Sequence, residues 1–172
     1  MIKAQGRNYN HVTGTAVGGG TMLGLGRLLI GSIDPQEIDE LAQTGNSNGV
    51  DLSLADVITG PIGTLPAEAT AVNFGRMVRT TAAPSRADLA AGIVTLIGQT
   101  IALIAINAAR SLPTTQIVIT GHLTDMVTIR RMLTAVGALY GQTMQMPTNA
   151  GYATALGALL TVSEQAAQTQ TS

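Results

Sequence analysis

Apolar positions follow a helical repeat of three to four residues along much of the chain. This spacing predicts helices at residues 22–30, 35–43, 50–58, 70–78, 89–109, 126–140 and 152–160. Runs rich in β-branched residues predict short strands at residues 2–4, 9–12, 116–120 and 143–146. The first two strands flank a turn at residues 5–7 and form a predicted hairpin. The later order of strand, helix, strand and helix is typical of an α/β domain with a partly parallel sheet.

Local signals define the second helix. Asp34 is its expected N-cap, Pro35 takes the first helical position, and Glu37 is expected to complete a capping box. Asp39 and Glu40 follow within the same helix, where acidic side chains near the N-terminus favour the helix dipole. We therefore interpret these acids as structural.

The longest apolar run, residues 89–109, contains no charged residue and is long enough to cross a membrane as a helix. Polar residues interrupt it and no aromatic belt flanks it, so we expect a buried core helix, capped by Ser85, and no membrane contact. Gly92 and Gly98 lower its helix propensity by up to ~1 kcal/mol each relative to Ala, which indicates the close approach of another helix. The irregular stretch at residues 60–68 is expected to be a surface loop.

The composition narrows the class of protein. A chain of 172 residues suits one domain, and with 2% aromatic residues its core must be built from Ala, Ile, Leu, Val and Met. A net charge of -1 provides no basic stripe, which argues against a nucleic-acid partner. The absence of cysteine excludes disulfides and thiolate zinc sites, and no signal-peptide pattern opens the chain, so we expect a cytoplasmic protein. Residues 1–162 are the expected domain, and residues 163–172 a polar, disordered tail.

A glycine run, Gly18, Gly19, Gly20 and then Thr21, comes directly before the first predicted helix. Such a run exposes backbone N–H groups at the positive end of a helix dipole, where a phosphate or nucleotide can bind. The alternative is that the glycines only form a tight loop. The run is neither a Walker loop nor a dinucleotide fingerprint, because the residues that complete those motifs are absent.

A second candidate site follows the strand at residues 116–120, which ends at Gly121 and His122. Ligands of open α/β folds bind at this carboxyl edge, so His122 can contact a base or ribose, or can merely cap the next helix. Residues 148–151 can close over the same edge, but we expect them to cap the last helix. His11, beside the glycine run, can bind an anion or be an exposed strand residue. No acidic pair has the spacing of a metal site or an acid/base couple, so we assign no catalytic residue and no metal ligand.

The stretch VTGTAVGGGTMLGL at residues 12–25 resembles the central glycine motif of type II pantothenate kinases. Further blocks resemble this family in the same order, at residues 39–42, 45–51, 65–75, 117–121 and 149–159. The ordered set covers about residues 7–160 and is far more specific than the glycine run alone. The resemblance implies an α/β fold that is the C-terminal half of an actin-like (ribonuclease H-like) kinase, rich in helices and with a partly parallel sheet.

The family phosphorylates pantothenate with ATP and Mg²⁺, the first step toward coenzyme A, and works as a homodimer. The resemblance therefore implies an ATP-binding kinase (a transferase), with Mg²⁺ held through the nucleotide and with pantothenate or pantetheine as the acceptor. His11 stands where the family usually has an arginine on the substrate side, and imidazole does not reproduce the guanidinium fork. His122 stands where the family has a small hydroxylated residue near the adenosine. The implied ATP contacts are Gly18, Gly19, Gly20, Thr21, Met22, Leu23, Gly121 and His122.

The resemblance covers only the second half of the family pattern. The first phosphate loop, the glutamate that acts as general base and a Gly-Thr-Gly-Thr loop are not matched, so we expect the chain to be inactive alone. A complementary N-terminal half would then supply the missing groups. Two alternatives remain: a non-catalytic dimerisation or regulatory module that uses residues 60–68 and 89–109, and a membrane-associated protein that uses residues 89–109 as a span.

Overall fold

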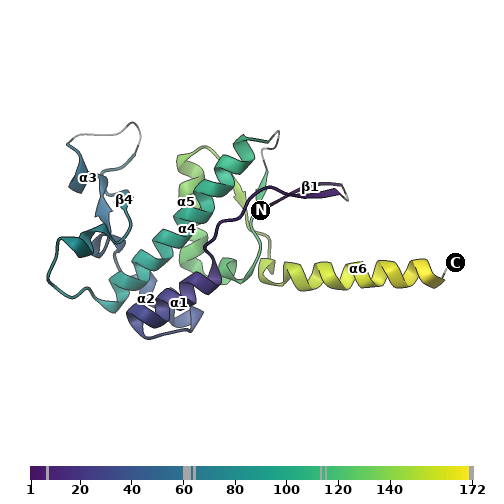
Figure 1. Cartoon of the computed structure of the whole chain (residues 1–172), viewed down its shortest axis with the longest axis horizontal. Coiled ribbons are helices and arrows are strands. Elements are labelled where there is room, and N and C mark those ends of the chain that lie inside the picture. Colours follow the sequence, from purple (N-terminus) through teal and green to yellow (C-terminus); the bar gives the residue numbers. More distant parts are fainter. Residues whose placement is uncertain (7, 60–62, 64, 113, 115, 171–172) are drawn as a thin grey trace.

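The computed structural model describes residues 1–6, 8–59, 63, 65–112, 114 and 116–170, and it is a helix-rich α/β structure. Its centre is the long helix α4 (Arg86–Arg110), against which α1 (Gly19–Ile30), α2 (Pro35–Thr44) and α5 (Val127–Leu139) pack. Figure 1 shows this helical body, with the hairpin and α6 (Ala153–Gln170) projecting from one end and the segment around α3 (Leu54–Val57) at the other.

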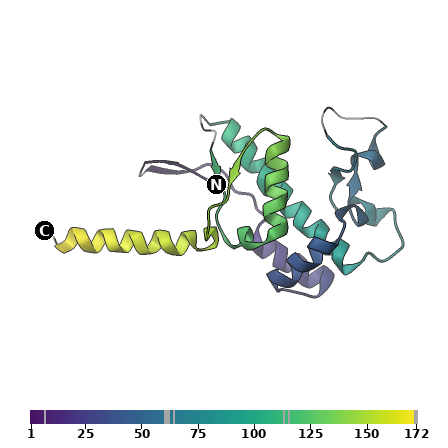
Figure 2. The same ribbon diagram turned by 180° about the vertical axis from the view of Figure 1, so that it is seen from behind.

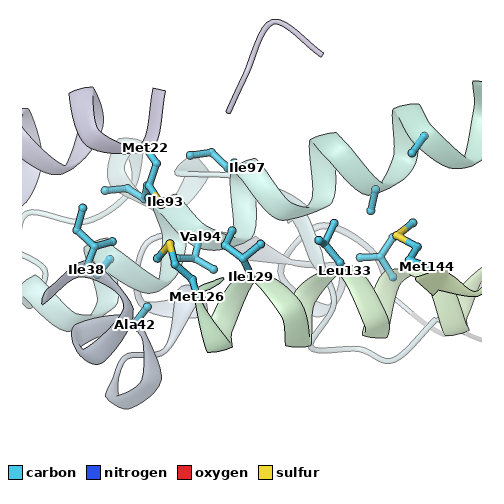
Figure 3. Close-up of a cluster of buried hydrophobic side chains, with 14 of the residues drawn as sticks. Met22, Ile38, Ala42, Ile93, Val94, Ile97, Met126, Ile129, Leu133 and Met144 are labelled. Carbon is cyan, nitrogen blue, oxygen red and sulfur yellow. The ribbon is translucent and has the colours of Figure 1, made fainter. Parts of the chain in front are cut away.

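The hydrophobic core lies where α4 meets the other three helices (Figure 3). Ile93 and Ile97 of α4, Ile38 of α2 and Ile129 of α5 are each 0% exposed. Aliphatic residues and methionines fill this core, as the composition predicts. The cluster of buried side chains is Met22, Ile30, Ile38, Ala42, Ala90, Ile93, Val94, Ile97, Ala102, Ala105, Ile106, Ala109, Ile117, Met126, Ile129, Leu133, Val136 and Met144.

The predicted burial of the long apolar helix is confirmed. Within the described part of the chain, α4 is the one helix long and apolar enough to cross a bilayer, with a mean hydropathy of 2.2 over its most apolar window. In the structure 61% of that window is buried in the interior. The core helix of a water-soluble protein meets the same criteria of length and composition.

The two glycines of α4 allow two different close approaches. A Cβ on Gly98 would lie 2.6 Å from Cγ of Met132 in α5, so the predicted approach of another helix is confirmed there. A Cβ on Gly92 would instead lie 2.4 Å from Cγ2 of Val50, which precedes a strand. The prediction of a neighbouring helix at Gly92 is therefore wrong, because an irregular segment occupies that side of α4.

The described strands form three two-stranded sheets. β1 (Ile2–Gln5) pairs with β2 (Asn8–His11) in the predicted antiparallel hairpin. β5 (Ile117–Val118) pairs with β6 (Met144–Gln145) in parallel, which confirms a partly parallel arrangement. The third sheet joins β3 (Leu52–Ser53) to β4 (Thr70–Val72). The described residues also form four short 3₁₀ helices: η1 (Ser47–Gly49), η2 (Gly75–Val78), η3 (His122–Asp125) and η4 (Ala150–Tyr152).

The helix predicted at residues 50–58 is confirmed only in part, as the short helix α3, and the α-helix predicted at residues 70–78 is wrong. These segments contain the paired strands β3 and β4, followed by α3 and η2. The carboxylate of Asp51 is fully buried between them and accepts a hydrogen bond from the backbone N–H of Phe74, at an N···O distance of 2.8 Å. Phe74 has a left-handed backbone with φ of 55°, which breaks helical geometry. A long-range polar contact thus overrides the local apolar spacing.

The helix caps are partly as predicted. Asp34 caps α2 by accepting the N–H of Gln36 at 2.9 Å, and Ser85 accepts the N–H of Asp88 at 3.0 Å before α4. Glu37 does not complete a capping box. Its carboxylate accepts the hydroxyl of Ser32 at 2.5 Å and the guanidinium of Arg86 at 2.7 Å, and both contacts lower the pKa of Glu37. The prediction failed because the arginine comes from a helix distant in sequence.

The last helix is longer than its apolar pattern predicts. We expected it to end at residue 160, but α6 continues to Gln170 because its later residues, rich in Ala and Gln, are good helix formers. Figure 2 shows α6 extending away from the body, and its residues 154–167 are exposed. Arg7 of the predicted turn, residues 60–62 and 64 of the predicted loop, and residues 171–172 lie outside the described residues.

Candidate functional site

A cavity of about 510 Å³ opens beside the N-terminus of α1. It brings together two segments that the sequence singled out separately, the glycine run and the turn at His122. The predicted contacts that line the cavity are Gly19, Met22, Leu23 and His122. The other predicted contacts are their neighbours in sequence: Gly18, Gly20, Thr21 and Gly121. Met22 is only 2% exposed, so most of its side chain belongs to the core. The complete lining is Gly19, Met22, Leu23, Pro35, Gln36, Asp39, His122, Leu123, Asp125 and Met126.

Three helices begin at this cavity, and their N-termini differ in one respect. α2 begins at Pro35 with Asp34 as its cap, and α5 begins after Met126 with its first N–H groups bound to Asp39. α1 has no acidic residue in its first turn and no cap from a carboxylate. Asp34 and Asp39 occupy the positive ends of α2 and α5, so the positive end of α1 is the one that remains available to an anion.

The backbone at the start of α1 is accessible. A Cβ added to Gly18 or Gly20 would meet nothing within 4 Å, and one added to Gly19 would meet only Cγ of Leu123, at 3.9 Å. The N–H of Gly18 donates to the hydroxyl of Thr21 at 3.3 Å, which holds the turn. The following N–H groups have no partners within the helix, as in the first turn of any α-helix. The turn can therefore present main-chain donors to a bound group.

The segment that precedes α6 packs against the turn at Gly121 and His122. The N–H of Gly121, whose φ is 109°, donates to the carbonyl of Ala150 at 2.9 Å. A Cβ on Gly151 would lie 2.7 Å from Nδ1 of His122, so these two turns are in direct contact. Residues 148–151 thus close over the edge of the sheet. The capping role that we favour for these residues stays a prediction: Asn149 is the N-cap residue of η4, which leads into α6, but its side chain makes no cap hydrogen bond there and its backbone is left-handed at φ of 59°.

Comparison with known proteins identifies the family. The family model described as Fumble matches residues 1–161, which is most of the chain. The chain belongs to the Fumble family. The resemblance to type II pantothenate kinases is thereby confirmed at the level of family.

Named relatives of this Fumble-family chain are similar along most of its length. The type II pantothenate kinase of Oceanobacillus iheyensis is 34% identical over 154 residues, which are 89% of this chain and 58% of the relative. The type II pantothenate kinase of Staphylococcus haemolyticus is 30% identical over 156 residues, 90% of this chain and 59% of the relative. That of Staphylococcus aureus (strain USA300) is 28% identical, again over 58% of its length. The Fumble-family chain therefore spans less than two thirds of the length of these relatives.

Asp39 is the residue of this Fumble-family site whose role sequence reasoning missed. Its carboxylate accepts the N–H groups of Val127 (3.0 Å) and Thr128 (2.9 Å) and the hydroxyl of Thr128. Asp39 belongs to α2 but caps α5, 88 positions away in the chain. We attributed it to the dipole of its own helix, because a sequence shows no contact between segments so far apart. Its low exposure of 8% is the structural sign of this role.

His11, the predicted substrate contact, lies away from the residues that line the cavity. It is exposed at the end of the β1–β2 hairpin and is not among the described residues that line the cavity. Its role as a substrate contact stays a prediction. The described part of the Fumble-family chain holds no cluster of three His, Cys, Asp or Glu side chains able to bind a metal ion.

A smaller cavity of about 390 Å³ lies between α2, α4 and α5. It opens at Gly45, the C-cap of α2, where the helix dipole is negative. Arg131 is the one charged residue among the described residues that line it, and the remaining lining is mostly small or apolar. This second cavity therefore lacks the accessible helix N-terminus that distinguishes the first.

Proposed function

We propose that this chain is the ATP-binding part of a pantothenate kinase, which transfers a phosphoryl group from ATP to pantothenate or pantetheine toward coenzyme A. The observation that supports this most directly is that the N-terminus of α1 has no carboxylate cap, at a cavity where two other helix N-termini are capped by aspartates. The names of the relatives support the same chemistry.

The residues present fit a nucleotide. A triphosphate is placed at Gly19, Gly20 and Thr21, where main-chain N–H groups and the helix dipole favour negative charge. The base and ribose are placed toward Leu23 and His122, which belong to the same cavity. ATP supplies the phosphoryl group, and Mg²⁺ is held through the phosphates. We propose that Met22, Gly18 and Gly121 shape this site through the backbone.

We further propose that the chain requires a complementary part for catalysis. Among the described residues that line the cavity, the two carboxylates are both engaged, Asp39 with α5 and Asp125 with His122 at 2.9 Å. Neither is available as a general base for the acceptor hydroxyl. His11 is proposed to face the acceptor in the assembled enzyme.

The surface of the chain supports such a partner. Leu156, Leu159 and Leu160 share one face of α6 and are each more than half exposed, as are Ile2 and Tyr9 of the hairpin. An exposed apolar helix face of this kind marks an interaction surface. We propose that this end meets the complementary half of an actin-like kinase fold, and that the assembled enzyme is a cytoplasmic homodimer. A non-catalytic dimerisation module would use the same surface without binding ATP.

A calorimetric titration of the chain with Mg·ATP tests the nucleotide site. Gly20→Asp places a carboxylate at the start of α1, and Gly24→Asp places the same group one turn later; a Cβ at either position meets nothing within 4 Å. We expect Gly20→Asp to weaken ATP binding at least about tenfold by charge repulsion and Gly24→Asp to change it much less. Absence of ATP binding to the parent chain, or equal losses in both variants, would refute the site.

Catalysis is tested separately, with the chain co-expressed with the part of the Oceanobacillus iheyensis relative that it does not cover. We expect pantothenate phosphorylation by the co-purified pair and none by the chain alone. Dimers that form without ATP binding, observed by analytical ultracentrifugation, would favour the non-catalytic alternative.

A further inference from the structure

His122 is an exposed side chain at the cavity, yet its ring is held in one orientation. Its Nδ1 lies 2.9 Å from Oδ2 of Asp125, three residues later in η3. The ring of Tyr152 meets the imidazole edge to face, with centroids 5.3 Å apart and planes at 83°. Gly151 leaves no space on the Nδ1 side, since a Cβ there would clash with both His122 and Asp125. Three contacts therefore orient an imidazole whose side chain is 71% exposed.

The contact with Asp125 also determines which ring nitrogen carries the proton. A carboxylate only accepts hydrogen bonds, so Nδ1 is the protonated nitrogen of the neutral ring. Nε2 then has a free lone pair and acts as an acceptor. An exposed, oriented acceptor at a cavity wall can distinguish a ligand that presents N–H from one that presents a carbonyl.

Purine bases differ in this way at position 6. Adenine presents an amino donor there, whereas guanine and hypoxanthine present a carbonyl acceptor. The wall near His122 also contains Leu123 and Met126, which suit the flat apolar face of a base. The phosphates would lie toward Gly19, at the open end of α1.

We propose that Nε2 of His122 accepts a hydrogen bond from the 6-amino group of adenine, and that His122 with Asp125 thereby selects ATP against 6-oxopurine nucleotides. This assignment rests on the proposed nucleotide site and adds the residue that gives it base specificity. Asp125 is a positioning residue, because it acts through the tautomer of the imidazole.

The test compares Mg·ATP with Mg·ITP by calorimetry on the full chain at pH 8. ITP carries hypoxanthine, which has an oxo group at position 6 and a hydrogen on N1, where adenine has the 6-amino group and an unprotonated N1. The ratio of the two dissociation constants therefore reports on this edge of the base. We expect ATP to bind at least about tenfold more tightly than ITP. His122→Phe keeps a flat ring but has no acceptor, so this ratio should fall close to one.

Asp125→Asn provides the readout that a purely structural role would not give. The amide of Asn can donate to Nδ1 and so favours the tautomer with Nε2 protonated. The preference for ATP should then be lost or reversed toward ITP. Nitrogen NMR of the two histidines, assigned with His122→Phe, should report the change of tautomer directly. Val118→Ala, a half-exposed change outside the cavity lining, is the matched control and should keep the ratio of the parent chain.

The outcomes separate the two proposals. If neither nucleotide binds the parent chain, the nucleotide site itself is refuted. If ATP binds but ITP binds equally well, or if His122→Phe or Asp125→Asn keeps the preference, the site stands and the assignment of His122 is overturned.

Discussion

Replacing Asp39 by Ala should destabilise the chain by about 3 kcal/mol. The substitution removes the N-cap of α5, typically worth about 0.5–2 kcal/mol, and leaves buried donors of Thr128 without an acceptor, at about 1–3 kcal/mol. Asp39→Asn keeps one acceptor oxygen, so its expected cost is about half as large. Urea unfolding followed by far-ultraviolet circular dichroism measures both values.

Glu40→Ala is the control for this prediction, because Glu40 is an exposed neighbour in the same helix. Its one hydrogen bond, from the side chain of Gln36 at 2.9 Å, joins residues four apart and should contribute less than about 0.5 kcal/mol. If Asp39→Ala costs no more than Glu40→Ala, Asp39 does not join α2 to α5 as the structure indicates.

Three further predictions concern stability measured in the same way. Gly45→Ala should lower the free energy of unfolding by about 3 kcal/mol or more, because its Cβ would lie 2.0 Å from the carbonyl oxygen of Ala87. Gly24→Ala meets nothing within 4 Å and should raise that free energy by up to about 1 kcal/mol. Similar values for the two variants would contradict the close packing of Gly45 on Ala87. Burial raises the pKa of Asp51 above its ordinary value of 3.8. The contribution of Asp51 to stability is therefore fully present below that value and is lost as pH rises through the pKa of the folded state, so Asp51→Asn should become more stable relative to the parent chain with rising pH. A difference in stability that stays constant with pH would refute this. Leu159→Gln should change the stability of the isolated chain by less than about 0.5 kcal/mol, because the side chain is 63% exposed, and a loss above 1 kcal/mol would show that α6 packs on the body.

The sequence predicted the elements that depend on local interactions. The β1–β2 hairpin, the start of α2 at Asp34 and the start of α4 at Ser85 follow from turn residues and caps that lie within a few positions of each other. The same reasoning failed at residues 70–78 and at the start of residues 50–58, of which only α3 is helical. There the local spacing favours helices, but the buried Asp51 and the strand pairing favour another conformation.

In the candidate site, too, the sequence predicted the local features but not the contacts between distant segments. The sequence indicated the glycine run and His122 as separate candidates, because glycine before a helix and a turn after a strand are local patterns. It could not indicate that one cavity contains both, nor that Asp125 orients the imidazole.

The sequence by itself thus determined that a glycine-rich turn opens α1, that α4 is apolar, and that the order of motifs is that of the Fumble family. Only the tertiary structure decided that Asp39 of α2 caps α5. It also decided that, in the part of the chain that the structure describes, α1 is the one helix N-terminus of the three at the cavity without a carboxylate. The physical reason is that a charged side chain stabilises a helix terminus only when it lies within about one turn of it in space. Folding can bring such a side chain from any part of the chain, and the sequence alone does not show which one.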